Sequence, residues 1–369
     1  MAKPRARDLG LDVPGTPGPH NAITDVPGVL VGYETIVRGD GPLVTGQGPM
    51  RTGVTAILPR GFEDEPTPVW AGTYDLNGNG EMTGTHWIAD GGYLVGPVCI
   101  TNTHSVGIVH HAAIRWMLKT YAKQFHASHL WGMPVVAETY DGLLNDINGL
   151  HVTEAHALAA LDSAAGGPIA EGNVGGGTGM IAYEFKGGTG TASRRIAIEG
   201  AGYTMGALVQ ANHGRREWLN VFGVPVGRYM KLDASPAVDK ELGSIIVVLA
   251  TDIPMLPHQL QRVARRAALG VGRGGTPGGN SSGDIFLAFS TANRMALPQL
   301  GQALLSMDFV NDERFDAIYL AAVEAVEEAV INAMLAAETT PMLRPAGKIC
   351  PAIDHDALVA IMRRHGRCG

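Results

Sequence analysis

The chain has 369 residues, a formal net charge of −7, 45% hydrophobic residues and 17% charged residues. This composition supports a large hydrophobic core and excludes a wholly disordered chain. No apolar run approaches the roughly 20 residues of a membrane helix, and no basic cluster with interleaved aromatic residues indicates a nucleic-acid surface. Glycine is the outlier, with 50 residues and no collagen-like period. It indicates many tight turns and close backbone contacts.

Short apolar runs bounded by glycine or proline predict strands before residue 240. These runs are residues 54–58, 93–100, 133–137, 179–185, 194–198 and 206–210. Helical spacing of apolar residues predicts helices at residues 105–125, 153–164, 257–269, 315–337 and 354–364. Pro257 and Gly270 stand at the two ends of one of these helices, a typical start and stop. Because strands outnumber helices before residue 240, we expect an antiparallel or mixed sheet with helices packed outside it.

The N-terminal segment, residues 1–28, is rich in proline and glycine and predicts an extended arm that suits packing against a neighbouring subunit. It has early positive charge but no apolar stretch of the kind a secretory signal carries. Cys99, Cys350 and Cys368 form no CxxC pair and indicate free thiols in a reducing compartment. The sequence therefore predicts a cytoplasmic protein.

A junction between a polar segment and an apolar run is the first candidate site. Residues 231–242 are polar and predict an exposed loop, whereas the run IIVVLATD (245–252) predicts a central strand covered on both faces. Gly243 and Ser244 join the two. A serine that self-cleavage makes N-terminal carries a base in its own α-amine, and glycine before it tolerates the distortion of an N→O acyl shift. The ordinary alternative is a Gly-Ser turn that starts a buried strand.

A second cluster lies in GGNSSGD (278–284) at the start of another apolar run. Ser282 and Asp284 are two positions apart, so on a strand they share one face. Asp284 could hold an ammonium group or orient the serine hydroxyl. An Asx or Ser turn is the alternative explanation.

Two further clusters follow predicted strands. Glu138 could bind a substrate ammonium, and Tyr140 could donate its hydroxyl to an oxyanion, although an ordinary polar strand end accounts for both. Asn212 could donate its amide to the same oxyanion. His213 follows it and could act as a base, but a lone histidine beside a glycine turn is more often structural.

Two patterns suggest a cofactor at first sight. The segment EGNVGGGTGM (171–180) resembles a phosphate-binding loop but lacks its lysine, and a strand rather than a helix is expected after it. His151 and His156 are five residues apart, which places their rings on different faces of a helix. Neither pattern predicts a nucleotide or zinc site.

Five motifs in this order resemble the DmpA family of self-processing serine aminopeptidases, which includes the β-peptidyl aminopeptidases. The motifs are AETYDG (137–142), QANHG (210–214), GSIIVVLATD (243–252), LPHQLQRVARRAALGVGR (256–273) and GGNSSGDIFLAFSTAN (278–293). The opening ITDVPGVLVGYETI (23–36) also resembles the start of the family. The resemblance covers nearly the whole chain, and five ordered motifs are far more specific than any one of them.

The resemblance implies a four-layer αββα sandwich in one domain over residues 1–369, similar to N-terminal-nucleophile hydrolases but with different strand connectivity. It implies self-cleavage between Gly243 and Ser244 into an α chain, residues 1–243, and a β chain, residues 244–369. It further implies a tetramer of αβ units that acts on short peptides, amino-acid amides or esters without a metal or cofactor.

The resemblance also implies a role for each candidate residue. These are Ser244 as nucleophile, Asn212 and Tyr140 as the oxyanion-stabilising pair, Ser282 and Asp284 beside the new α-amine, and Glu138 as the group that receives the substrate's amino group. The acidic position varies between Asp and Glu in the family, and Asp284 places the chain nearer to the family's namesake than to the dedicated β-peptidases. An acyl-transferring relative and a non-catalytic, uncleaved assembly protein are the alternatives.

Overall fold

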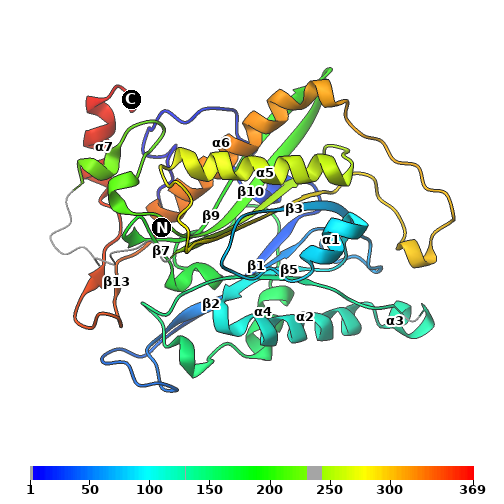
Figure 1. The fold of residues 1–369 in the computed structure, drawn as a ribbon, viewed down its shortest axis with the longest axis horizontal. Helices are drawn as coiled ribbons and strands as arrows, with labels where there is room; N and C mark the ends of the chain where they lie inside the picture. The colour runs from blue at the N-terminus through cyan, green and yellow to red at the C-terminus, as the bar shows by residue number, and fades with distance from the viewer. Residues whose placement is uncertain (1–2, 129, 231–242) are drawn as a thin grey trace.

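Two β-sheets stacked face to face form the centre of the fold, and helices cover the outer face of each (Figure 1). The structure is a computed structural model that describes residues 3–128, 130–230 and 243–369, so the predicted loop at 231–242 lies outside the described residues. The smaller sheet has the order β1 (Leu30–Arg38), β2 (Met50–Leu58), β5 (Val98–Asn102) and β6 (Val135–Thr139). The larger sheet has the order β4 (Tyr93–Leu94), β3 (Val69–Gly78), β12 (Gly283–Ser290), β11 (Ser244–Thr251), β10 (Ala201–Asn212) and β9 (Gly188–Ile198).

The helices divide between the two outer layers. In chain order they are α1 (Thr85–Gly91), α2 (Val106–Thr120), α3 (Ala122–Ser128), α4 (Glu154–Asp162), α5 (Pro257–Arg273), α6 (Phe315–Leu335) and α7 (His355–Arg364). Helices α5 and α6 cover the larger sheet, whereas α2 and α4 cover the smaller one (Figure 1). Two short hairpins complete the fold, β7 (Ile181–Ala182) with β8 (Phe185–Lys186) and β13 (Thr340–Pro341) with β14 (Ile349–Cys350). No helix of the described residues combines the length and apolarity needed to cross a membrane.

Strand β11 shows why the chain forms these layers. Its side chains alternate: Ile245 and Val247 pack in the apolar cluster under α5 and α6, while Ile246 packs in the cluster between the two sheets. All eight residues of the strand are buried. Since both faces of the strand are covered, every position is apolar or small, and the prediction of a doubly covered strand is confirmed.

Both sheets are mixed, as expected. Strands β11 and β12 are parallel, and so are β5 and β6, whereas the other pairs in the two sheets are antiparallel. The sequence patterns did not predict β1, β3 or α1. Residues 93–100 form two short strands rather than one, because Gly96 and Pro97 interrupt the run.

Three predicted elements differ from those in the structure. Residues 179–185 form a hairpin instead of a strand, because Tyr183 and Glu184 take positive φ angles and turn the chain. The helix at 105–125 is divided at Tyr121. Gly270 does not end α5, which continues to Arg273; a Cβ atom at residue 270 would lie 2.7 Å from Val326 of α6, so this glycine permits close helix packing.

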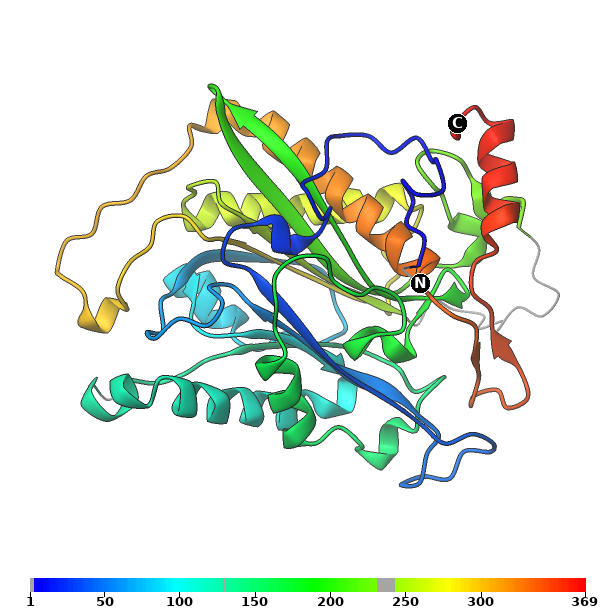
Figure 2. The same ribbon diagram turned by 180° about the vertical axis from the view of Figure 1, so that it is seen from behind.

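The N-terminal arm packs on its own subunit. Figure 2 shows it crossing α6. The Ala6 N–H donates to Asn332 Oδ1 at 3.0 Å, and Arg7 forms an ion pair with buried Glu328 at 3.0 Å. Ala6 and Arg7 therefore contact α6 of their own chain, and packing of the arm against a neighbouring subunit stays a prediction.

Candidate active site

Ser244 lies at the start of β11, in the middle of the larger sheet. It pairs with Asn212 of β10 on one side and with Gly283 of β12 on the other. The side chain is 6% exposed, and its Oγ accepts a hydrogen bond from the Gly283 N–H at 3.2 Å. A Cβ atom at residue 243 would lie 2.1 Å from the Asn212 carbonyl oxygen. Only glycine fits directly before the serine.

Asn212 connects Ser244 to two other segments. Its Oδ1 accepts from the Ile181 N–H at 2.8 Å, and its Nδ2 donates to the Tyr140 carbonyl oxygen at 3.0 Å. An amide nitrogen carries two N–H groups, and the second has no acceptor among the described residues. Tyr140 follows the end of β6 and is partly exposed. The structure therefore brings both predicted oxyanion residues to the end of the sheet where Ser244 lies.

Ser282 and Asp284 form a fixed pair next to Ser244. The Ser282 hydroxyl donates to Asp284 Oδ1 at 2.6 Å, and Asn77 Nδ2 donates to Oδ2 at 3.3 Å. The backbone N–H of Ile245 donates to the same carboxyl group. Burial raises the pKa of Asp284, and the hydrogen bonds from Ser282 and Asn77 oppose that rise. The carboxyl group is thus held at the backbone nitrogen of Ile245, the residue after Ser244.

Glu138 is a buried carboxyl group with both oxygens already oriented. The Glu81 N–H donates to Oε1 at 3.0 Å, and the Thr103 hydroxyl donates to Oε2. Burial raises the pKa of Glu138, whereas these two hydrogen bonds lower it. Each oxygen keeps a further lone pair for a ligand. Such a fixed, half-satisfied carboxylate can receive an ammonium group.

Asn77, Glu81 and Thr103 were not predicted as part of the site. The run Asn-Gly-Asn-Gly at 77–80 is a signal that could have marked its segment, because such residues form tight polar turns. Thr103 gave no signal, since its role depends on its contact with Glu138 alone.

His213 is structural in its environment, as expected. It is buried edge-on against Tyr183, with ring centroids 5.1 Å apart, and neither ring nitrogen has a hydrogen-bond partner among the described residues. Burial lowers its pKa to about 3. The ring therefore stays neutral at physiological pH and packs behind Asn212.

The two cofactor-like patterns have structural roles as well. In the glycine-rich segment, Gly175–Gly179 form a buried 3-10 helix, and a short strand follows instead of an α-helix. His151 bonds to Asp146 at 2.8 Å, and His156 bonds back to the N-cap Thr153. In the described part of the chain, no cluster of three or more His, Cys, Asp or Glu side chains could hold a metal ion.

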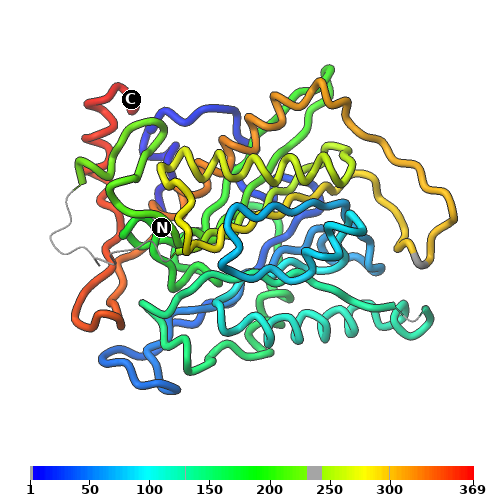
Figure 3. The backbone as a smooth tube through the Cα atoms, viewed as in Figure 1, coloured from blue at the N-terminus to red at the C-terminus, as the bar shows by residue number. Residues whose placement is uncertain are grey.

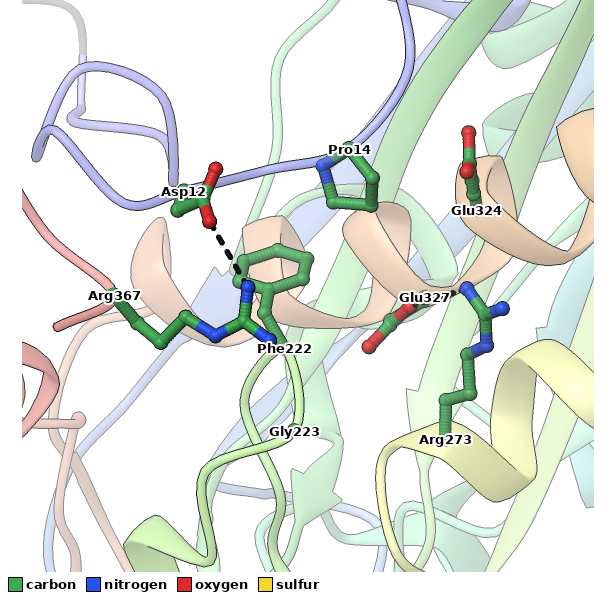
Figure 4. Close-up of a pocket in the computed structure, with 8 residues that line it drawn as sticks. All are labelled: Asp12, Pro14, Phe222, Gly223, Arg273, Glu324, Glu327 and Arg367. Atoms are coloured by element: carbon green, nitrogen blue, oxygen red, sulfur yellow. Dashed lines mark hydrogen bonds and ion pairs between the residues drawn. The ribbon is translucent and has the colours of Figure 1, made fainter. Parts of the chain in front are cut away.

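A cavity of about 380 Å³ lies between the N-terminal arm, the C-terminus, α5 and α6 (Figure 4). Its charged side chains are engaged with protein partners. Arg367 pairs with Asp12 at 3.0 Å, and Arg273 pairs with Glu327 at 3.1 Å. None of the candidate residues described above lines this cavity.

Residues 21–345 match peptidase family S58. The β-peptidyl aminopeptidase of Sphingosinicella microcystinivorans is 50% identical over 377 residues, covering 99% of this chain and 93% of the relative. The chain belongs to peptidase family S58. The β-peptidyl aminopeptidase of Sphingosinicella xenopeptidilytica is 46% identical and covers 98% of this chain and 92% of its own. The resemblance to the DmpA family is thereby confirmed.

Solved structures agree with this assignment. The L-aminopeptidase D-Ala-esterase/amidase of Ochrobactrum anthropi, a variant of the Ntn hydrolase fold, is 58% identical with a TM-score of 0.95 over all of both chains. A Burkholderia β-aminopeptidase is 46% identical with a TM-score of 0.90, covering 98% of this chain and 99% of its own. The predicted α+β sandwich is confirmed. This member of family S58 is an enzyme, a serine aminopeptidase of the N-terminal-nucleophile type.

Proposed function

We propose that this aminopeptidase releases N-terminal residues from short peptides, amides and esters, with Ser244 as a nucleophile that self-cleavage makes N-terminal. The observation that carries the proposal is the placement of Ser244 as first residue of β11, with Asn212, Gly283 and the Ser282–Asp284 pair around it. These groups offer an oxyanion donor, a backbone N–H and an oriented carboxyl group around one residue.

Maturation follows from the chemistry of the Gly243–Ser244 bond. Ser244 Oγ attacks the Gly243 carbonyl carbon and transfers its proton to the departing nitrogen, so the amide becomes an ester. Water then hydrolyses the ester, leaving the Gly243 carboxylate and a free α-amine on Ser244. The products are chains of residues 1–243 and 244–369, which together still form the layers of one sandwich.

In the mature enzyme the new α-amine is the base. Its ordinary pKa of about 7.7–8 suits proton transfer near neutral pH. Ser244 Oγ attacks the substrate carbonyl, and the Asn212 amide and Tyr140 hydroxyl stabilise the oxyanion. Ser282 and Asp284 orient the α-amine. The intermediate then collapses to an acyl ester on Ser244, and the α-amine gives its proton to the departing amine or alcohol. Water hydrolyses this ester, which releases the acyl group as a carboxylic acid and restores the serine.

Glu138 selects substrates with a free amino group. Its carboxylate lies beside the site and is held by the Glu81 N–H and the Thr103 hydroxyl. A substrate ammonium would form a charge-assisted hydrogen bond there. The relatives named for L-aminopeptidase, D-Ala-esterase and β-peptidyl aminopeptidase activity support α- and β-aminoacyl compounds as the substrate class.

Intact-mass measurement tests the proposal. Wild type should give two chains, whereas Ser244→Ala should remain one chain of 38.7 kDa and hydrolyse no alanine amide. A wild-type chain that remains uncleaved and still hydrolyses alanine amides would refute the mechanism. Product analysis with an added amine separates hydrolysis from acyl transfer, which uses the same acyl-enzyme. Membership of a peptidase family disfavours a non-catalytic assembly protein.

We also propose a cytoplasmic homo-oligomer, a tetramer of αβ units. The segment between β12 and α6 extends from the side of the molecule (Figure 3) and exposes Leu304 (87%), Leu305 (51%) and Phe309 (57%). Contiguous exposed apolar side chains are typical of protein interfaces. The free thiols of Cys99, Cys350 and Cys368 suit a reducing compartment. Native mass spectrometry of the cleaved enzyme tests the tetramer.

A further inference from the structure

The end of β3 and the residues directly after it, 77–81, connect the two halves of the site. Asn77 Nδ2 donates to Asp284 and to the Gly279 carbonyl oxygen, while Asn79 Nδ2 donates to the Ser281 carbonyl oxygen at 2.6 Å. Two residues after Asn79, as described, the Glu81 N–H donates to Glu138. One short segment thus touches both the nucleophile's side of the site and the carboxylate that receives the ammonium.

Gly80 lies between Asn79 and Glu81 of this segment, where a side chain would enter the site. A Cβ atom there would lie 3.1 Å from Glu138 Oε1, 3.4 Å from Gly283 Cα and 3.5 Å from Ile285 Cδ1. The Gly283 N–H in turn donates to Ser244 Oγ. The space beside the absent Cβ therefore lies between the ammonium-binding oxygen and the residue that contacts the nucleophile.

This space matters because a substrate is held at both ends. Its ammonium lies at Glu138, and its carbonyl carbon lies at Ser244. A β-aminoacyl group contains one more C–C bond of about 1.5 Å between those ends than an α-aminoacyl group. With the ends fixed, the extra methylene must bend aside or the ammonium must move deeper, and both need room next to Glu138.

We propose that Gly80 is a specificity-determining residue, whose missing side chain leaves the room that β-aminoacyl substrates need. This inference rests on the proposed roles of Glu138 and Ser244. An added methyl group at residue 80 removes that room while leaving the shorter α-aminoacyl group in place. Gly80 does not have a positive φ angle, so alanine fits its backbone conformation.

The test compares L-alanine and β-alanine p-nitroanilides on self-cleaved enzyme. Gly80→Ala should lower kcat/KM for the β-alanyl compound at least about tenfold and change that for the L-alanyl compound less than about threefold. Gly78→Ala is the matched control, because a Cβ atom there meets nothing within 4 Å. It should leave both values unchanged.

Ile285→Val is the second variant, since valine lacks the Cδ1 atom that borders the same space. It should raise the ratio of β-alanyl to L-alanyl activity. If Gly80→Ala does not self-cleave, Ile285→Val alone tests the role of this space. Three outcomes would overturn this inference but leave the proposed function standing. They are an equal loss of activity on both substrates in Gly80→Ala, an unchanged activity ratio in Ile285→Val, and a wild type that hydrolyses only the L-alanyl compound. A cleaved wild type that hydrolyses neither compound overturns the proposed function as well.

Discussion

Ser244 and Asn212 are direct partners across the antiparallel strands β11 and β10. The Asn212 side chain also holds the Ile181 N–H and the Tyr140 carbonyl oxygen. The Asn212 side-chain amide therefore ties the β7–β8 hairpin and the segment after β6 to β10, whose backbone pairs with β11. Replacing the Asn212 amide should therefore have a specific effect on the site.

Asn212→Asp should lower kcat by about 10²–10³ with little change in KM, because aspartate keeps the acceptor for Ile181 but offers no N–H to the oxyanion. The measurement is steady-state kinetics normalised to the cleaved fraction found by mass spectrometry. The melting temperature serves as the control for folding. An unchanged kcat would show that the oxyanion is stabilised elsewhere.

Glu138→Gln should raise KM for amino-acid amides by about 10- to 150-fold, the loss expected for a hydrogen bond to a charged group worth about 1.5–3 kcal/mol. Glu81→Gln is the matched control, since Glu81 contacts Glu138 through its backbone N–H and its side chain is exposed. Equal KM values for Glu138→Gln and wild type would argue against the ammonium role.

The pH dependence of KM should report the raised pKa of Glu138. As the pH falls through that pKa the carboxylate takes up a proton, so KM rises, and it begins to rise at a higher pH than an ordinary glutamate would give. Thr103→Val removes a hydrogen bond that lowers this pKa and should move the rise to higher pH. Thr103→Ser keeps the hydroxyl and should resemble wild type; identical profiles for the valine and serine variants would contradict this explanation.

Because of Lys186, the free energy of unfolding should depend on pH. Burial lowers its pKa to about 7, so above that pH the unfolded chain binds a proton that the folded chain does not. The free energy of unfolding should therefore increase with pH between about 7 and 10, relative to Lys186→Met, by up to about 1.4 kcal/mol per pH unit. Urea unfolding of both forms in the uncleaved Ser244→Ala chain measures it. A difference that is constant from pH 7.5 to 9.5 would show that the lysine stays charged when buried.

Local pattern predicted the elements whose signal lies in their own residues. The uninterrupted apolar run of β11 and the helical spacing of apolar residues in α6 are examples. The ordered motifs identified the family. Local pattern failed where contacts between distant residues determine the structure. Gly270 looks like a helix end in the sequence, but in the structure it allows α6 to pack closely against α5.

The site shows the same division. Ser244, Asn212, Ser282, Asp284 and Glu138 lie in recognisable motifs. Asn77 reaches Asp284 across 207 residues, and Thr103 reaches Glu138 across 35. The Asn-Gly-Asn-Gly run around Asn77 indicates only a tight polar turn, and the neighbours of Thr103 give no signal. A single sequence therefore reveals the reacting groups more readily than the groups that hold them.

Strands β11 and β12 lie in the larger sheet between β3 and β10, both of which precede the Gly243–Ser244 bond in the chain. If that bond is cut as we propose, neither polypeptide retains all the backbone partners of its strands. Folding would then have to precede cleavage, and a denatured cleaved enzyme would need a bimolecular reassembly step that the uncleaved precursor does not need. Heat inactivation of the cleaved enzyme should therefore be irreversible, and its half-life should be set by its rate of unfolding.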